Sequence, residues 1–253
     1  MNLLRGRCNT RKLRTAIIGT CLCHRALSSL GRIPSCTALK IAVVTGSTRT
    51  SGPPSINGPR IASFVRHELE ERGNTIVAEI DPRDFPLLEK PEFAHHRRTV
   101  PKPLREARAV LEEADAYVCI TPEYNHAPSP GLVNVLNHFG SSVFSFKPSA
   151  IVSYSAGQWG GTRAAIALRP ILSELGALPV SAMIHIPNAQ DAIDDDGTPT
   201  TDPKRWKEYC GRCFSQLEWW ADAAKNHKEI ADPFEESKPF RLTPSQRNAP
   251  KKQ

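Results

Sequence analysis

Three polar, glycine-containing stretches each follow an apolar run, and their residue types could do chemistry. They are GSTRTSGPPSING at 46–58, PEYN at 122–125 and SYSAGQWGG at 153–161. In the first, Ser47 supplies a hydroxyl and Arg49 a guanidinium fork suited to a dianion. A helix beginning near Asn57 and Gly58 would add free N–H groups and a positive dipole end. These features favour a phosphate ligand, although any strand-to-helix turn also uses Gly, Ser and Pro.

The first stretch matches neither of two common nucleotide-binding patterns. It lacks the spacing GxGxxG, and it lacks the lysine of GxxxxGK[ST]. The sequence therefore does not indicate a dinucleotide-binding Rossmann loop or a P-loop.

The second stretch begins where Pro122 is expected to end an apolar strand that starts at Tyr117. Glu123, Tyr124 and Asn125 then place carboxylate, aromatic and amide groups side by side. Successive backbone N–H groups at such a bend could bind the polar edge of a planar heterocycle. The simpler alternative is a polar turn that only caps the next helix.

The third stretch combines glycines with an aromatic residue. Gly157 and Gly160 would let the backbone approach a ligand closely, and Trp159 offers a surface for stacking. The alternative is that these glycines serve only to turn the chain from strand to helix.

Apolar, β-branched runs alternate with stretches of helical periodicity, which predicts βαβ units and a parallel sheet covered on both faces. The predicted strands are KIAVVTGS after Leu39, TIVAEI, DAYVCIT, SAIVSYS and LPVSAMIHI, and the predicted helices span 58–72, 102–114, 131–139, 160–176 and 203–225. The expected fold is α/β: a three-layer flavodoxin-like fold with a five-stranded parallel sheet in the order 2-1-3-4-5. The three polar stretches would follow the first, third and fourth strands. They would meet at the carboxyl ends near the topological switch point, and together they describe a site for a mononucleotide such as FMN.

The sequence resembles the NADPH-dependent FMN reductases of flavodoxin-like fold, which include azo-dye, quinone and chromate reductases. The matching segments are GSTR, then PEYN followed by the helix start PGLVN, then SYSAGQWGGTRA leading to LRPILSELG. They occur in order between about residues 40 and 186.

This resemblance implies a two-electron reductase with FMN as resident cofactor and NADPH or NADH as donor. The electrons would pass to a small acceptor such as a quinone, an azo compound or free flavin. Because the flavin carries the chemistry, no catalytic side chain is expected and no metal is required. The residues that the resemblance assigns to FMN are Ser47, Arg49, Asn57, Gly58, Pro122, Glu123, Tyr124, Asn125, Ser155, Ala156, Gly157 and Gly160.

The resemblance also implies a homodimer or homotetramer, because in this family the helix after PEYN contributes to a dimer interface. This chain departs from the pattern there. Val133 and Asn137 stand where relatives commonly place Lys and Asp. A second hypothesis remains open: a non-catalytic flavin-binding electron carrier, or a redox-sensing interaction module.

Two further motifs have a structural interpretation. The pair of cysteines in CGRC at 210–213 has redox spacing, but apolar residues recur around it at helical intervals. Both thiols are therefore expected on a buried helix face. His95 and His96 lack a second ligand pair at metal spacing, and we expect them in a solvated loop.

The net charge of +7 is distributed unevenly. Residues 1–67 hold eleven Lys or Arg and no acidic residue, whereas the rest of the chain carries 22 basic and 26 acidic residues. A nucleic-acid partner needs clustered positive charge on the folded part, so none is expected. No run approaches eighteen apolar residues, and no membrane span is expected.

The composition divides the chain into three parts. Residues 1–38 are basic, rich in Ser, Thr and Cys, and free of acid. They are interpreted as a mitochondrial transit peptide, a disordered extension or translation from an upstream start codon. Residues 39–226 form the predicted FMN-binding reductase domain, and 227–253 a disordered polar tail. The expected location is cytoplasmic, or mitochondrial if the first segment is a transit peptide.

Overall fold

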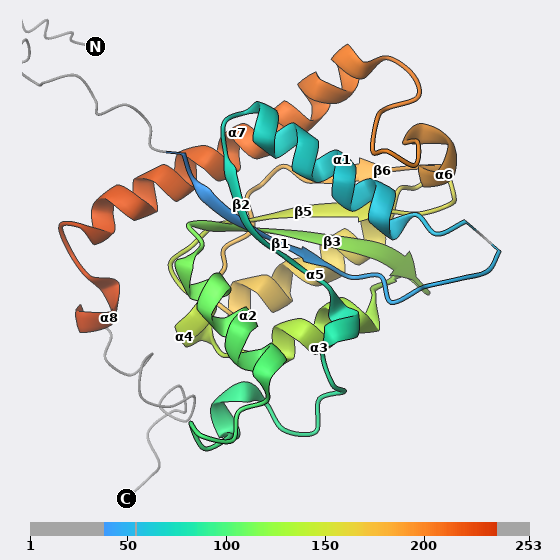
Figure 1. Cartoon of the computed structure of the whole chain (residues 1–253). Coiled ribbons are helices and arrows are strands. Elements are labelled where there is room, and N and C mark those ends of the chain that lie inside the picture. Colours follow the sequence, from blue (N-terminus) through green and yellow to red (C-terminus); the bar gives the residue numbers. More distant parts are fainter. Residues whose placement is uncertain (1–37, 54, 237–253) are drawn as a thin grey trace, which may run out of the picture. The chain divides into compact units, whose positions relative to one another are not determined.

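Figure 1 shows a computed structural model of the chain, which describes residues 38–53 and 55–236. The predicted N-terminal extension lies outside the described residues apart from Ala38, as do residues 237–253 of the predicted tail. Within the described part, no helix is both long enough and apolar enough to span a bilayer.

A parallel sheet forms the centre of the domain. Its strands are β1 (Lys40–Thr45), β2 (Thr75–Ile80), β3 (Ala116–Tyr124), β5 (Ser149–Tyr154) and β6 (Ile184–Ile186), in the spatial order β2-β1-β3-β5-β6. This confirms the predicted α/β fold and the order of its five parallel strands. The structure adds β4 (Ala127–Pro128), a two-residue strand that pairs antiparallel with the end of β3.

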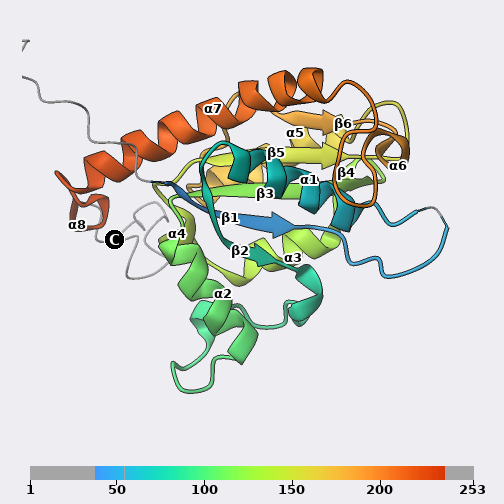
Figure 2. The ribbon, with the colours of Figure 1, turned by 45° about the horizontal axis from the view of Figure 1, so that its top comes forward.

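Alternating strand residues pack into two separate cores, one on each face of the sheet. In β1, Ile41 and Val43 belong to the core beneath α1 (Gly58–Glu71) and α7 (Pro203–Lys228). Ala42 and Val44 belong to the opposite core. That core lies beneath α2 (Lys102–Glu113), α3 (Pro130–His138), α4 (Ser141–Phe144) and α5 (Thr162–Glu174). Because both faces are covered (Figure 2), β5 is buried along its whole length and β3 is buried from Ala116 to Pro122.

The predicted helix boundaries agree with the structure to within about three residues, and shorter elements complete the described chain. These are the 3-10 turns Pro82–Asp84 and Glu92–Ala94, and the helices α6 (Ala189–Ala192) and α8 (Pro233–Glu236). The domain boundary predicted at 226 falls inside α7, which continues to Lys228. Only the last three residues of the predicted fifth strand form β6, and before them Pro179 makes an isolated bridge to Ser149.

The strand expected to end before Pro122 continues through it to Tyr124. Pro122 is in register with Tyr154 of β5, whereas the pairing of β3 with β1 ends at Ile120. Beyond Ile120 the strand has only one parallel neighbour, which is a position where a proline lacking an N–H is tolerated. The expectation that this proline stops the strand was wrong for that reason.

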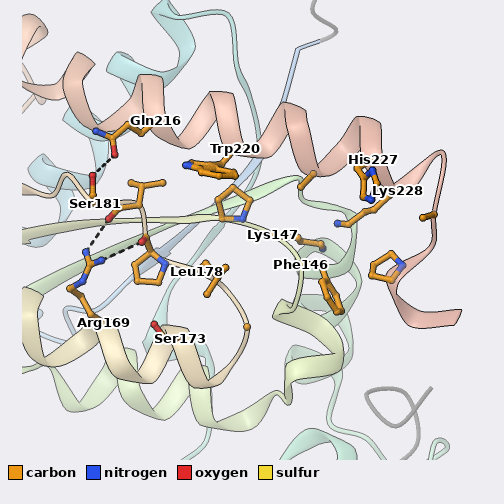
Figure 3. Close-up of a pocket in the computed structure, with 17 residues that line it drawn as sticks. Phe146, Lys147, Arg169, Ser173, Leu178, Ser181, Gln216, Trp220, His227 and Lys228 are labelled. Carbon is orange, nitrogen blue, oxygen red and sulfur yellow. Dashed lines mark hydrogen bonds between the residues drawn. The ribbon is translucent and has the colours of Figure 1, made fainter. Parts of the chain in front are cut away.

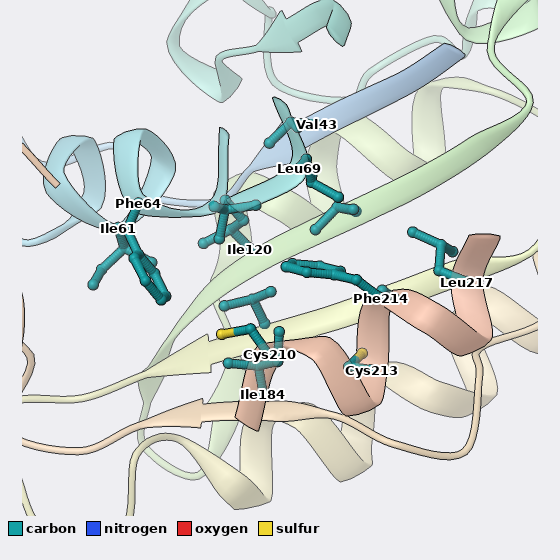
Figure 4. Close-up of a cluster of buried hydrophobic side chains, with 14 of the residues drawn as sticks. Val43, Ile61, Phe64, Leu69, Ile120, Ile184, Cys210, Cys213, Phe214 and Leu217 are labelled. Carbon is teal, nitrogen blue, oxygen red and sulfur yellow. The ribbon is translucent and has the colours of Figure 1, made fainter. Parts of the chain in front are cut away.

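Both CGRC cysteines lie on the buried face of α7, as predicted. Figure 4 shows Cys210 and Cys213 among side chains such as Phe214, Leu217 and Ile184. Burial raises the pKa of the Cys213 thiol to about 12 and raises that of Cys210 as well. Because the thiolate is the reactive form, these thiols act as core packing groups.

Gly46, at the end of β1, allows the first loop to pass close to α3. A Cβ there would lie 2.5 Å from Ser129 Oγ and 2.8 Å from the Ile120 carbonyl oxygen. We expect Gly46→Ala to lower the free energy of unfolding by about 1–3 kcal/mol, because the added methyl group would crowd these two atoms. Urea unfolding measures this change in the free energy of unfolding. Gly211→Ala, within α7, is the matched control. Its nearest neighbour atom is 3.6 Å away, and helix propensity predicts a gain of about 0.5–1 kcal/mol. Equal effects of the two substitutions would contradict the steric argument.

Candidate functional site

A cavity of about 230 Å³ opens where β1, β3 and β5 end, and all three predicted loops contribute to its wall. Its lining residues are Ser47, Arg49, Ser55, Ile56, Asn57, Pro122, Glu123, Tyr124, Tyr154, Ser155 and Ala156. The parallel pairing of β3 with both neighbours places the three loops at one edge of the sheet. The predicted convergence of the loops is therefore found in the structure.

Eight of the twelve predicted residues line this cavity, and four do not. Gly58 begins α1 and lines a smaller cavity of about 110 Å³ that shares Ser47 and Arg49. Asn125 is exposed, and Gly157 and Gly160 lie outside the lining.

Asn125 and His126 form the two-residue turn between β3 and β4. Their φ angles are 50° and 66°, so both residues are left-handed, as a type I′ hairpin requires. The turn also helps to extend β3 past Pro122, because Tyr124 pairs with Ala127 across the turn.

Gly160 has a structural reason for being glycine. Its φ is +59°, and a Cβ there would approach the backbone nitrogen of Ile186 to 3.0 Å. Its carbonyl accepts a hydrogen bond from buried Ser153 at 2.8 Å. Ser153 Oγ also lies 2.8 Å from His185 Nδ1. The third loop is thus anchored to β5 and β6 from beneath.

Arg49 lies across the first loop. Its guanidinium nitrogens are within 3.4–3.5 Å of the carbonyl oxygens of Ser51, Gly52 and Ser55. The side chain is half-buried and lines both cavities. Arg49 therefore organises the loop and also brings a permanent positive charge to the cavity wall.

Asn57 presents an unused polar atom at the start of α1. The residue is 8% exposed, and its side chain forms no capping bond to the helix. Its Oδ1 is buried and has no hydrogen-bonding partner among the described residues. A buried polar atom left unpaired is costly. This amide, on the cavity wall, is therefore suited to a polar ligand.

Tyr154, Ser55 and Ile56 also line the cavity, although the sequence reasoning did not select them. Tyr154 is the last residue of β5 and is 5% exposed. Burial raises its pKa well above the ordinary value despite a hydrogen bond with the Ser47 side chain. The sequence feature that could have identified Tyr154 is its position in SYS, at the carboxyl end of a predicted strand.

Glu123 ties the second loop to the third. Its side chain is only 6% exposed, and Oε1 accepts a hydrogen bond from Arg163 Nε at 2.8 Å. Oε2 accepts from the backbone N–H groups of Arg163 and Ala164 at the start of α5. Burial alone would raise the pKa of this carboxyl, but Arg163 and the Ala164 N–H outweigh it and lower the pKa. Although it lines the cavity, Glu123 also caps a helix.

The described residues contain no group of three or more His, Cys, Asp or Glu side chains arranged to hold a metal ion. The His95 and His96 side chains are half-buried and exposed, respectively, which agrees with the predicted solvated loop.

The family model for NADPH-dependent FMN reductases matches residues 39–191, which include all three loops. This chain belongs to that family. It is an oxidoreductase whose cofactors are FMN and NAD(P)H, as the sequence resemblance implied.

Relatives of this FMN reductase support the assignment. The chain is 26% identical to an NADPH azoreductase from Bacillus sp. (strain OY1-2) over 64% of its own length and 85% of the relative's. It is 33% identical to a quinone reductase from Pseudomonas putida over 62% of its own length and 82% of the relative's. The solved flavoenzyme NAD(P)H:(acceptor) oxidoreductase from Paracoccus denitrificans shares the fold, with a TM-score of 0.53 and 23% identity. That alignment covers 73% of this chain and 98% of the other.

Replacing Glu123 by Gln tests the tie between the loops. Because the folded-state pKa of Glu123 lies below its ordinary value of 4.5, its stabilisation is present above that value. It is lost as pH falls through the lowered pKa. We expect Glu123→Gln to lower the free energy of unfolding at pH 7 by about 1–3 kcal/mol. The difference from the unsubstituted chain should narrow below pH 4.5.

The measurement is urea unfolding at a series of pH values. Glu106→Gln is the control, because Glu106 pairs with Lys102 on an exposed helix face. Its expected effect is below about 0.5 kcal/mol. A pH-independent difference for Glu123→Gln would contradict the ion-pair account.

Proposed function

We propose that this FMN reductase holds its flavin in the cavity at the ends of β1, β3 and β5 and passes two electrons to a small organic acceptor. The observation that carries the proposal is the buried Asn57 Oδ1, which has no hydrogen-bonding partner among the described residues and belongs, like Arg49, to a residue lining that cavity. The acceptor class is a quinone, an azo compound or free flavin, supported by relatives named as azoreductase and quinone reductases.

The first loop would hold the FMN phosphate. Arg49 contributes a permanent cation, and Ser47 and Ser55 contribute hydroxyls within the same lining. The Asn57 amide can present its N–H₂ group toward an anion, because its oxygen and nitrogen exchange places by rotation. The start of α1 adds backbone N–H groups nearby.

The second and third loops would orient the ring system. Pro122 and Tyr124 of the second loop and Ser155 and Ala156 of the third loop all belong to the lining. The acidic lining residue, Glu123, is paired with Arg163, so its charge is offset where a reduced flavin would carry negative charge. Bound FMN supplies the redox chemistry itself, and the protein supplies orientation and electrostatics.

Absorbance spectroscopy tests the activity directly. The purified chain is incubated with FMN, freed of excess flavin, and mixed without oxygen with NADPH or NADH. We expect retained flavin absorbance that bleaches on addition of the nucleotide and returns on addition of a quinone. Flavin that is retained but bleached by neither nucleotide would instead support the electron-carrier hypothesis.

Asn57→Ala tests the placement of the cofactor. Because Asn57 Oδ1 has no partner among the described residues, its removal should leave the thermal stability of the apoprotein nearly unchanged. The Kd for FMN should rise about tenfold, which corresponds to about 1.4 kcal/mol of lost hydrogen bonding. Fluorescence titration with FMN measures this Kd.

Thr50→Ala is the matched control, since Thr50 is an exposed hydroxyl of the same loop outside the cavity lining. Its Kd should stay within twofold of the unsubstituted chain. An unchanged Kd for Asn57→Ala would place the flavin elsewhere.

We also propose a homodimer or homotetramer that uses α3, as the family resemblance implies. On this helix Asn137 is exposed and Val133 is half-buried, so an apolar and amide contact would replace the charged pair of relatives. Light scattering at micromolar concentration should give at least twice the chain mass. A monomer would contradict this proposal.

A further inference from the structure

A second and larger cavity lies at the opposite end of the sheet from the proposed flavin site. It is a groove of about 740 Å³ between the last turns of α7, the segment before β5, and the segment 176–181 (Figure 3). Pro148, immediately before β5, lines the groove, whereas Tyr154 at the other end of β5 lines the flavin cavity. The volume is in the range of small-molecule sites. The groove shares no lining residue with the site already described.

The middle of the groove is apolar and accessible. Trp220 of α7 is 54% exposed, and Leu178 on the facing segment is 66% exposed. Figure 3 shows both side chains in the groove, between the Ser181–Gln216 hydrogen bond and the cluster of basic residues. Large exposed apolar side chains gathered in a concave site and bordered by polar groups indicate a binding surface.

One end of the groove is cationic. Lys147, His227 and Lys228 gather there in Figure 3. With Arg169, they are the basic members of the lining, and none of the described lining residues is acidic. Phe146, which also lines the groove, contacts Phe234 edge to face at 5.4 Å between ring centroids.

These cationic side chains differ in whether they already donate hydrogen bonds within the protein. Lys147 donates to the Leu111 and Glu112 carbonyls at 2.8 Å, and Arg169 donates to the Val180 carbonyl at 3.0 Å. The Lys228 side chain forms no hydrogen bond or ion pair with another described residue, and Lys228 is half-buried. Lys228 is therefore the ammonium group best placed to receive an anion.

The charge balance at this end favours an anionic ligand. Burial, followed by the charge of Lys228, lowers the pKa of Lys147 to about 8, and burial lowers the pKa of Lys228. Asp115 and Asp232 favour charge on Lys228. They already accept hydrogen bonds from Lys225 and from the Phe234 N–H, respectively. An added anion would stabilise both ammonium groups in a partly desolvated place.

We propose that this groove binds a small amphipathic anion, with its acidic head group at Lys228 and its apolar body against Trp220 and Leu178. The chain's own last segment is a poor occupant on grounds of charge. Residues 237–253 contain five Lys or Arg and no acidic residue, so they would bring more positive charge to a cationic end.

Calorimetric titration of the full chain tests the binding of an amphipathic anion to the groove. The probe is decanoate below its micellar concentration, and decanol is the matched uncharged compound. We expect decanoate to bind at least tenfold more tightly than decanol. Lys228→Gln should weaken decanoate at least fivefold and leave decanol unchanged. The control is Lys204→Gln, an exposed lysine near the start of α7 outside the groove lining. Equal affinity for decanoate and decanol would overturn the proposal.

Substitutions of two adjacent tryptophans test the contact proposed for the apolar body of the ligand. Trp219 and Trp220 contact each other edge to face at 4.6 Å between ring centroids, so either substitution removes that contact. Only Trp220 lines the groove. Trp220→Ala should weaken decanoate at least tenfold, and Trp219→Ala less than twofold. Leu178→Glu gives a second test at an exposed position, with the same expected loss. Far-UV circular dichroism verifies that each variant is folded.

Other occupants would give different results. If residues 237–253 cover the groove, a chain ending at Glu236 would bind decanoate at least tenfold more tightly than the full chain. If a second copy covers it, Trp220→Ala would convert an oligomer to a monomer in light scattering. Either result, or equal effects of the two tryptophan substitutions, would overturn the proposal.

Discussion

Strand β3 pairs in parallel with β1 on one side and β5 on the other, and the described site depends on this double pairing. The ladders run from Ile41 opposite Ala116 to Pro122 opposite Tyr154. They bring three loops, at 46–58, 122–125 and 153–161 in the chain, to one edge of the sheet. Because the strands are buried on both faces by the two cores, the edge that holds the loops is rigid.

Polar residues around the cavity also hold the loops in place. Glu123 binds Arg163 and the first N–H groups of α5, and Arg49 contacts three carbonyl oxygens of its own loop. Ser153 anchors the Gly160 carbonyl from below. A cofactor that carries its own chemistry needs a wall of fixed shape more than it needs a reactive side chain. Asn57 is the contrasting case, since its buried Oδ1 forms no hydrogen bond with a described residue.

The two ends of β5 differ in chemistry. At its carboxyl end, Tyr154 faces a small cavity surrounded by loop hydroxyls and Arg49. At its amino end, Pro148 belongs to a wide apolar groove with a cationic rim. Since the same strand separates the two, the proposed flavin cavity and the groove share no lining residue.

The family resemblance assigned eight of the residues around the cavity, and local patterns in the chain were enough to predict the five parallel strands and most helix boundaries. The strands and helix boundaries follow from the periodicity of apolar residues and from turn residues, which act over a few neighbouring positions. They did not predict that β3 would continue through Pro122, because that depends on where β1 ends beside it. They also missed Tyr154 and the Glu123–Arg163 pair. A tyrosine becomes part of a cavity, and a carboxylate becomes a helix cap, only when folding brings in partners such as a residue 40 positions away.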